Sequence, residues 1–384
     1  MTISCEIVRI ALLTYSTRSR GGVVHTTYLA EALAKKGHYV EIFALGPPFD
    51  FYRKVSVPYK IFKTEQIENE VLRERVKRLI NVYIQEMSNY LDFDIYHAQD
   101  CISGNAIEHL REKGLIKNTV RTIHHFERYS DEEVNKCQKF AIMRASHRLV
   151  VSKYWQRYLK RRLGVDSEVI YNGLDASRYS PSIDGSRLRK ELSLTDNFVF
   201  LSVGGIEPRK GSLYLLRAFY KVSKSMPDAK LVIVCTKGIV NHDPYQTKFA
   251  TEVKSLNLKD KVVLIQNFPD DKMPELYRGS DVFVFPSLLE GWGLAPMEAQ
   301  GCGLPVIAFD LPSMRELLNK DNALLVKKKD VDMLARAMIE VANNRELAHK
   351  LAQKGRLNAL KYSWEDTAFS VLKYYEYLLN LLKT

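Results

Sequence analysis

Two glutamates with seven residues between them are the clearest chemical feature of this 384-residue sequence. Glu290 stands in a glycine-containing loop, and Glu298 follows in the segment Leu-Ala-Pro-Met-Glu. A carboxylate repels an anion but accepts hydrogen bonds from hydroxyl groups, so the pair suits a sugar or a ribose. Phosphates of the same ligand would bind to backbone N–H groups near by. The alternative is an ordinary loop acid at Glu290 and a first-turn helix carboxylate, favoured by the helix dipole, at Glu298.

The residues on either side of the pair predict a strand, a loop and a helix. Residues 282–285, Val-Phe-Val-Phe, predict a buried strand of a parallel sheet that is covered on both faces. Pro296 suits the first turn of a helix that runs through Glu298 and ends at Gly301 or Gly303. Ligands of open parallel sheets bind at the carboxyl ends of strands, against helix N-termini. The pattern therefore predicts a ligand site where this strand ends.

A second glycine-rich turn, residues 204–211, connects a predicted strand with a predicted helix that begins at Ser212. The turn contains two adjacent cations, Arg209 and Lys210. Backbone N–H groups, positive charge and a helix dipole together suit a diphosphate. The turn lacks the Gly-Lys-Ser/Thr of a Walker loop. The alternative is a solvated basic turn.

The N-terminal part of the chain repeats this alternation. A predicted strand at 7–16 leads into a loop that ends in Gly21 and Gly22, and a predicted helix at 23–36 and a strand at 39–45 follow. This order is typical of a Rossmann-like domain. The loop lacks the Gly-x-Gly-x-x-Gly spacing of a dinucleotide site. Glycines in this loop would let its backbone approach a ligand closely. The alternative is a purely structural turn.

Two histidines, His124 and His125, follow a predicted strand at 119–123 and so stand where ligands of a parallel sheet bind. A hydrogen-bonded structural histidine is the alternative. We expect residues 46–63 to be irregular and 65–90 to form a long covering helix.

Length and composition predict two domains of ordinary size, with 46% hydrophobic and 27% charged residues. Five cysteines without a Cys-x-x-Cys pair predict reduced thiols, a cytoplasmic protein and no metal site. No apolar run reaches the roughly 18–20 residues of a membrane span. The net charge of +12 is spread along the chain, and no nucleic-acid motif accompanies it. The basic stretch 153–162 is either a solvated helix face or a weak peripheral contact at an inner membrane face.

The spacing Glu290-x7-Glu298 resembles the signature of the retaining family 4 of GT-B glycosyltransferases. Three more segments, which begin at Gly21, His97 and Gly204, look like a little-characterised branch of that family. The resemblance implies two α/β Rossmann-like domains with parallel sheets facing across a cleft, and a C-terminal helix that crosses back to the first domain. The implied boundaries are 1–176, a linker at 177–184, 185–362, and the helix at 363–384.

The resemblance also implies roles for particular residues. One departure concerns Gly205, which stands where the family has an arginine; Arg209 would take over that task. The residues implied to be catalytic are Glu290 and His124; those implied to bind the nucleotide sugar are Gly22, Arg209, Lys210, Gly293, Leu294 and Glu298; those implied to line the cleft or meet the acceptor are Gly21, Asp100, His125 and Asn172.

The function implied by this resemblance is the metal-independent transfer of a hexosyl group, with retention. The donor would be a nucleotide-diphosphate sugar of UDP, GDP or ADP, and no cofactor would be bound permanently. The acceptor would be a small molecule, a lipid or a glycan. Two alternatives stay open: a nucleotide-sugar epimerase of the same fold, and a non-catalytic scaffold that binds a nucleotide sugar. The base, the sugar, the acceptor and the oligomeric state are not predicted.

Overall fold

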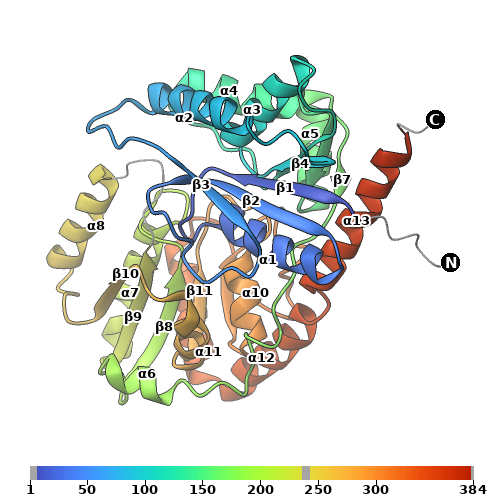
Figure 1. The fold of residues 1–384 in the computed structure, drawn as a ribbon. Coiled ribbons are helices and arrows are strands. Elements are labelled where there is room, and N and C mark those ends of the chain that lie inside the picture. Colours follow the sequence, from blue (N-terminus) through green and yellow to red (C-terminus); the bar gives the residue numbers. More distant parts are fainter. Residues whose placement is uncertain (1–6, 236–242, 382–384) are drawn as a thin grey trace. The chain divides into compact units, whose positions relative to one another are not determined.

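The structure is a computed structural model that describes residues 7–235 and 243–381 (Figure 1). The chain forms two compact units, one made of Met1–Gly173 with Trp364–Thr384 and the other of Leu174–Ser363. Residues 177–184, predicted to be a linker, belong to the second unit. Of the cysteines, Cys5 lies outside the described residues, and the four others are free thiols.

A seven-stranded sheet forms the centre of the first unit, in the order β3-β2-β1-β4-β5-β6-β7. Every pairing in it is parallel. The strand order reverses between β1 and β4, and ligands of doubly wound sheets bind beyond the carboxyl ends of strands at such a point. The strands are β1 (Arg9–Thr14), β2 (Tyr39–Gly46), β3 (Tyr59–Lys63), β4 (Ile95–Ala98), β5 (Thr119–Ile123), β6 (His147–Val150) and β7 (Glu168–Val169).

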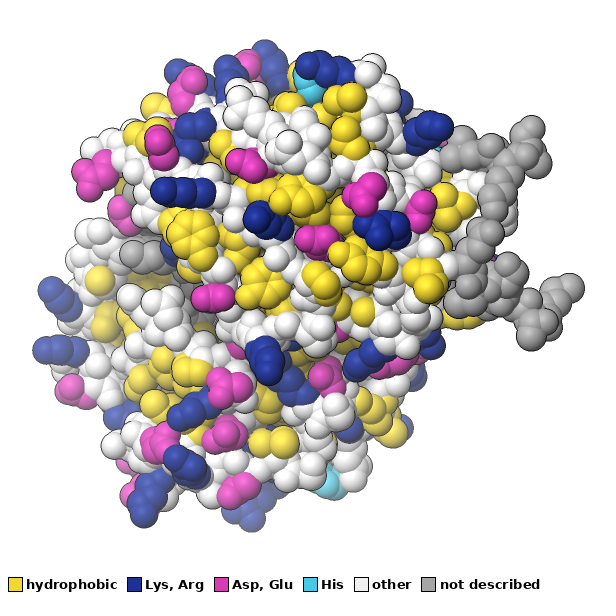
Figure 2. Space-filling model, in the orientation of Figure 1, with side chains coloured by type: hydrophobic (Ala, Val, Ile, Leu, Met, Phe, Trp, Pro, Cys, Tyr) yellow, Lys and Arg dark blue, Asp and Glu magenta, His cyan; other side chains and the backbone are white. Residues whose placement is uncertain are grey.

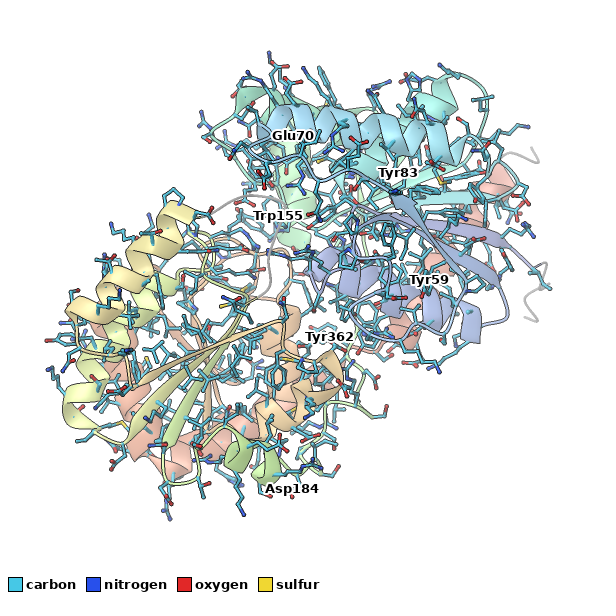
Figure 3. All side chains as sticks on the ribbon, turned by 60° about the vertical axis from the view of Figure 1, so that its left-hand side comes forward. Tyr59, Glu70, Tyr83, Trp155, Asp184 and Tyr362 are labelled. Carbon is cyan, nitrogen blue, oxygen red and sulfur yellow. The ribbon has the colours of Figure 1, made fainter. Side chains whose placement is uncertain are left out.

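Helices cover both faces of this sheet: α2, α3 and α4 pack together on one face, and α1 and α13 on the other (Figure 1). Tyr83 of α2, labelled in Figure 3, is fully buried, and its hydroxyl contacts the carbonyl oxygens of Thr14 and Phe43. These contacts fix the end of β1, from which the glycine loop departs. The helices are α1 (Gly21–Lys35), α2 (Leu72–Met87), α3 (Cys101–Glu112), α4 (Glu132–Met143), α5 (Lys153–Leu163) and α13 (Trp364–Leu381).

The segment predicted to be irregular, 46–63, contains the edge strand β3, so that prediction was wrong in part. β3 pairs with β2 alone, and only Phe62 of its five residues is buried. An edge strand of this kind lacks the apolar run by which the central strands were recognised. The helix predicted at 65–90 is shorter and begins at Leu72.

The second unit has a six-stranded sheet in the order β10-β9-β8-β11-β12-β13, again with parallel pairings only. Its strand order reverses between β8 and β11. The turn after β8 and the loop after β11 are the two segments predicted to bind a ligand, and they leave the sheet side by side. The strands are β8 (Phe198–Val203), β9 (Ala229–Cys235), β10 (Val262–Gln266), β11 (Val282–Phe285), β12 (Val306–Phe309) and β13 (Leu324–Val326).

The core of the second unit joins the sheet to α7 and α11, through buried side chains such as Phe200, Phe219 and Met338. Burial of each such side chain stabilises the folded state by about 1.5–3 kcal/mol. This core therefore stabilises the sheet from which the two loops depart. The helices are α6 (Ser186–Glu191), α7 (Ser212–Ser225), α8 (Asp243–Ser255), α9 (Met273–Arg278), α10 (Leu294–Gly301), α11 (Val331–Asn343) and α12 (Arg345–Ala359), with a 3₁₀ turn, η1 (Asp270–Lys272), before α9.

The two segments that connect the units run side by side within the second unit. Leu174 and Ser363 form a parallel β-bridge, and the N–H of Leu174 donates to the carbonyl oxygen of Tyr362 at 3.0 Å (Figure 3 labels Tyr362). The ring of Tyr362 packs edge-on against Trp292, with ring centroids 4.9 Å apart.

The surface carries mixed charge. Figure 2 shows Lys and Arg side chains interspersed with Asp and Glu over the visible face. Among the described residues, no helix is both long and apolar enough to cross a membrane.

Candidate active site

The predicted site residues lie in both units. In the second unit most of them lie at the strand-order reversal, and in the first unit they lie near the start of α1 and the segments after β4, β5 and β7. In the second unit the turn after β8 meets the loop after β11, because the N–H of Leu288 donates to the carbonyl oxygen of Arg209 at 2.7 Å. Gly211 permits this approach: it has φ +68°, and a Cβ there would lie 2.0 Å from the carbonyl oxygen of Pro286. A side chain at this position would separate the two loops.

Glu290 is the centre of this group. Its Oε1 lies 2.7 Å from Nζ of Lys210 and 3.1 Å from Nη1 of Arg209, and it accepts a hydrogen bond from the Ser287 hydroxyl at 2.8 Å. Burial raises the pKa of Glu290, but the charges of Lys210 and Arg209 outweigh burial and bring the pKa to about 2. The carboxylate is therefore ionised at every physiological pH. The sequence placed Glu290, Arg209 and Lys210 on the two loops; the structure brings them into contact.

Lys210 is affected by burial, by the charge of Glu290 and by the start of a helix. Burial lowers the pKa of its ammonium group, against the opposing charge of Glu290. The helix α7 begins two residues later at Ser212, so the positive end of its dipole lies beside the same turn. Gly204 and Gly205 both have positive φ, of 140° and 94°, as the tight turn before these cations requires.

Glu298 lies apart from this cluster, on α10. The Tyr277 hydroxyl donates to its Oε2 at 2.9 Å. Burial raises the pKa of Glu298 to about 7; Asp270 adds to this effect, and Tyr277 and Arg178 oppose it. α10 begins at Leu294, so Pro296 lies in its first turn as predicted, and Glu298 lies in the second turn and not in the first. The first-turn dipole explanation of Glu298 is therefore wrong.

Gly293 and Leu294 form the start of α10. Gly293 is the N-cap residue with φ +106°, and a Cβ there would lie 2.8 Å from Cε of Met314 and 3.0 Å from Cγ of Pro296. The half-buried Leu294 follows as the first helical residue. The positive φ at this helix start favours glycine over any residue with a side chain.

In the first unit, the glycine loop and the histidine strand end come together. A Cβ on Gly22 would lie 3.6 Å from Cδ2 of His124, whereas one on Gly21 would meet nothing within 4 Å. Nε2 of His124 lies 3.2 Å from Oε1 of Gln99, which follows β4. Burial lowers the pKa of His124 well below its ordinary value, and the neighbouring His25 adds to this effect. The imidazole of His124 is neutral at pH 7.

Three further predicted residues have partners within the first unit. Asp100 caps α3, where its Oδ1 accepts from the N–H groups of Ile102 and Ser103, both at 2.9 Å. Nε2 of His125 lies 3.5 Å from a carboxylate oxygen of Glu127. Asn172 is buried, and its Oδ1 lies 2.8 Å from Nδ1 of His25.

Sequence reasoning missed several residues of these groups. His25 occupies a position three residues after Gly22 in α1, on the same side of the helix, and this spacing could have identified it. Gln99 directly precedes Asp100 at the end of β4. Tyr277 stands 21 residues before Glu298, and no local pattern connects the two.

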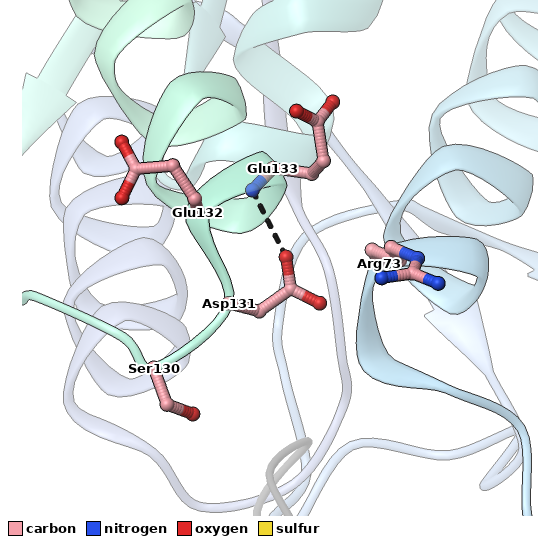
Figure 4. A pocket seen from close by; sticks show the side chains of 5 residues that line it. All are labelled: Arg73, Ser130, Asp131, Glu132 and Glu133. Atoms are coloured by element: carbon pink, nitrogen blue, oxygen red, sulfur yellow. Dashed lines mark hydrogen bonds between the residues drawn. The ribbon is translucent and has the colours of Figure 1, made fainter.

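A shallow hollow of about 430 Å³ lies elsewhere in the first unit, between the starts of α2 and α4 (Figure 4). Arg73 and the residues 130–133 line it, and Oδ1 of Asp131 accepts from the N–H of Glu133 at 2.9 Å. None of the predicted site residues lines this hollow. Within 7–235 and 243–381, no group of three or more His, Cys, Asp and Glu is arranged to hold a metal ion.

Two family models match the chain, one in each half. The model described as Glycosyltransferase Family 4 matches residues 19–178, and the model described as Glycosyl transferases group 1 matches residues 186–358. An uncharacterized glycosyltransferase of Methanocaldococcus jannaschii is 24% identical, over 98% of this chain and 100% of its own. The UDP-Gal:alpha-D-GlcNAc-diphosphoundecaprenol alpha-1,3-galactosyltransferase of Escherichia coli is 29% identical, over 73% of each chain.

Solved structures share the fold. Sucrose-phosphate synthase of Thermosynechococcus elongatus superposes with a TM-score of 0.82 at 22% identity, over 97% of this chain and 100% of the other. Anabaena HepE, in complex with UDP and glucose, superposes with a TM-score of 0.80 at 19% identity, over 95% of this chain and 98% of the other. The predicted fold, with two parallel-sheet Rossmann-like domains as in GT-B structures, is confirmed.

Proposed function

The chain belongs to glycosyltransferase family 4 and is a glycosyltransferase, and on this premise we propose which reaction it performs. It transfers a hexosyl group, with retention and without a metal ion, from a nucleotide-diphosphate sugar to an acceptor. The observation that carries the proposal is the contact of Lys210, Arg209 and Glu290 at the strand-order reversal of the second unit.

The cations of this cluster would hold the diphosphate of the donor. When the bond between sugar and phosphate breaks, negative charge develops on the leaving diphosphate. Lys210, Arg209 and the N-terminus of α7 are fixed in place before the reaction, so they stabilise that charge without reorganisation. This electrostatic contribution would take the part that a bound metal ion plays in other transferases.

The two glutamates would hold hydroxyl groups. Glu290, ionised with a pKa of about 2, would accept hydrogen bonds from the donor sugar and favour positive charge at its anomeric carbon. Glu298 would accept from the ribose hydroxyls. The turn at Gly293 and Leu294 would bring backbone N–H groups of α10 to the same ligand.

The first unit would contribute the acceptor side of the reaction. His124, neutral and held by Gln99, would hydrogen-bond the donor sugar or the acceptor. Gly21 and Gly22 leave the backbone of the α1 N-terminus open to a ligand. His125, Asp100 and Asn172 would line or support this side.

Relatives guide the choice of donor and acceptor. A galactosyltransferase named for UDP-Gal and a structure named for its complex with UDP and glucose make UDP sugars the first donors to test. The acceptor named for the galactosyltransferase is a lipid-linked sugar. A lipid acceptor would bring this chain to a membrane surface, where the exposed cations of α5 would meet anionic headgroups from the cytoplasmic side.

Thermal shift followed by calorimetry tests the proposal. UDP, GDP, ADP and their glucose, mannose and N-acetylglucosamine conjugates are added to the protein in EDTA. Since a ligand of the folded state raises the melting temperature, one nucleotide should raise it, and Lys210→Ala should reduce that rise at the same nucleotide concentration. An absence of any shift in folded protein would refute the transferase proposal. An epimerase would convert the bound sugar without an acceptor, and product analysis by NMR would reveal this.

A further inference from the structure

His25, on the inner side of α1, has no assigned role, yet it lies where four segments of the first unit meet. The residue is 2% exposed. It packs edge-on against His124, with centroids 4.8 Å apart, and edge-on against Trp364 of α13, with centroids 5.6 Å apart. Its Nδ1 lies 2.8 Å from Oδ1 of Asn172. His25 therefore connects α1, on which it lies, with the end of β5, the segment after β7 and α13.

The amide oxygens that lie against the two imidazoles imply where their protons are. The amide oxygen of Asn172 can only accept, so Nδ1 of His25 carries the proton and its Nε2 has the lone pair. That Nε2 is buried and has no hydrogen-bond partner among the described residues. By the same logic, Nε2 of His124 donates to Oε1 of Gln99, and Nδ1 of His124 is left as an acceptor.

The neighbours of His25 also connect it with both segments that link the two units. Asn172 precedes the division of the chain at Gly173 by one residue, and Trp364 is the first residue after the second division. Trp364 in turn stacks on Tyr28, one helical turn after His25, with centroids 5.3 Å apart and rings 5° from parallel. His25 thus contacts a residue of the first unit beside each of the two links.

We propose that His25 is a positioning residue for His124: its ring restricts rotation of the His124 ring, and its bond to Asn172 fixes that arrangement to the segment linking the units. His124 then presents its Nδ1 lone pair to a hydroxyl group and keeps its Nε2–H on Gln99. The significance of this for catalysis rests on the proposed function, in which His124 faces the donor sugar or the acceptor.

Neutrality of both rings is part of the arrangement. Burial lowers the pKa of His25 from 6.5 to about 4, against a smaller raising effect of Asn172. The titratable groups that act on these rings are His97 on β4, Arg121 on β5, and His125 after β5. A proton on either His25 or His124 would add a cation to this buried group, so both rings stay neutral together.

Nitrogen-15 NMR of selectively labelled histidines tests the proposal without any substrate. The full-length protein should show His124 as one tautomer, protonated at Nε2, between pH 6 and pH 8. In His25→Leu the His124 ring is free to turn, so a second tautomer should appear with comparable intensity. His25→Asn keeps an amide donor near the former Nδ1 but has no ring, so it should restore only part of the single-tautomer signal. A His124 spectrum unchanged in His25→Leu, with only the melting temperature lowered, would overturn the proposal.

Two further variants complete the design. Asn172→Ala removes the acceptor of His25 and should produce the same mixed His124 signal, which also covers the case in which His25→Leu does not fold. If His124 stays a single tautomer in that variant, the proposal also fails. His349→Leu changes an exposed histidine of α12 and should leave the His124 spectrum as it is. Calorimetry with UDP separates the two proposals: its affinity depends on the second unit and should stay within twofold in His25→Leu. If the wild type itself binds no nucleotide, the proposed function is refuted, whatever the His124 spectra show.

Discussion

Nζ of Lys210 lies 2.7 Å from Oε1 of Glu290, so the cation proposed for the diphosphate is paired with the carboxylate proposed for the sugar. Arg209 lies 3.1 Å from the same oxygen. Neither cation needs to leave Glu290 to meet a phosphate, because an ammonium and a guanidinium each have several N–H donors. The pair holds the cations at the turn before a ligand arrives.

The substitution Lys210→Ala should weaken binding of the nucleotide sugar by roughly 10- to 100-fold, the contribution of a hydrogen bond to a charged group. It should also raise the pKa of Glu290, because the Lys210 ammonium lowers this pKa more than the Arg209 guanidinium does. Calorimetry with UDP-glucose, or with the donor that the nucleotide panel identifies, measures the affinity. The matched control is Lys221→Ala on α7, the helix that follows Lys210, where a half-exposed lysine pairs with Asp332 at 2.7 Å. Equal affinity in both variants would contradict the assignment.

Glu298 should make donor binding dependent on pH. Its pKa of about 7 means that the carboxyl group is protonated below neutrality, and it is then a weaker acceptor for the ribose hydroxyls. Binding of the ribose to the ionised form releases a proton, so affinity should rise about tenfold between pH 6 and pH 8. A nucleotide sugar is the right probe, since its diphosphate does not titrate in this range.

Calorimetry at pH 6, 7 and 8 measures this dependence, and Glu298→Gln should remove it. Glu340→Gln, an exposed residue of α11, serves as the control and should keep the slope. A slope that persists in Glu298→Gln would place the titrating group elsewhere.

Stability of the first unit should fall in mild acid. Burial lowers the pKa values of His25, His97 and His124, so the unfolded chain binds protons at a pH where the folded chain does not. The stabilisation is complete above pH 6.5 and is lost as the pH falls toward the folded values, by about 1.4 kcal/mol per pH unit for each histidine.

Urea unfolding of the wild type and of His25→Asn between pH 7 and pH 5 isolates one of these contributions. The variant should lose stability less steeply, by up to about 1.4 kcal/mol per pH unit. The raised pKa of Glu298 acts in the opposite direction, because its contribution is lost as the pH rises from 4.5 through 7. The contribution of Glu298 is the same in the wild type and in His25→Asn, so it cancels when the stability of one is subtracted from that of the other. Parallel slopes would show that His25 is protonated in the folded state.

Trp364 should anchor α13 to the first unit. It is 5% exposed, and it contacts the rings of both His25 and Tyr28. Trp364→Ala should cost about 3–5 kcal/mol, as large-to-small changes of buried aromatic residues do. Phe369→Ala removes an aromatic ring from the same helix, but this ring is 53% exposed, and the cost should stay within about 0.5 kcal/mol. Urea unfolding measures both, and similar costs would contradict the anchoring role.

Local patterns were sufficient to predict much of the second unit. The strand predicted at 282–285 is β11, because an apolar run between turn residues has few other outcomes. The sequence placed Glu290 on one loop and Arg209 and Lys210 on another, each after the carboxyl end of a strand, where ligands of parallel sheets bind. Their direct contact is shown by the structure alone. The family and the fold are confirmed; the functional roles of the individual residues stay predictions.

Contacts distant in the sequence could not be predicted. The Tyr277 hydroxyl donates to Glu298 from another helix. The rings of His25 and Trp364 are in contact although the two residues lie near opposite ends of the sequence. The edge strand β3 was missed because pairing on one side only does not demand an apolar sequence. Such features depend on tertiary neighbours, which a local pattern does not contain.

The bridge between Leu174 and Ser363 makes the second unit an insertion whose two ends are adjacent. A continuous piece of chain with neighbouring ends can be cut out and replaced as a cassette. Residues 174–363 could then be exchanged for the corresponding segment of a relative at just two joints, after Gly173 and before Trp364. Donor preference would travel with the cassette if it depends on the second unit alone, while acceptor preference would stay with the recipient chain.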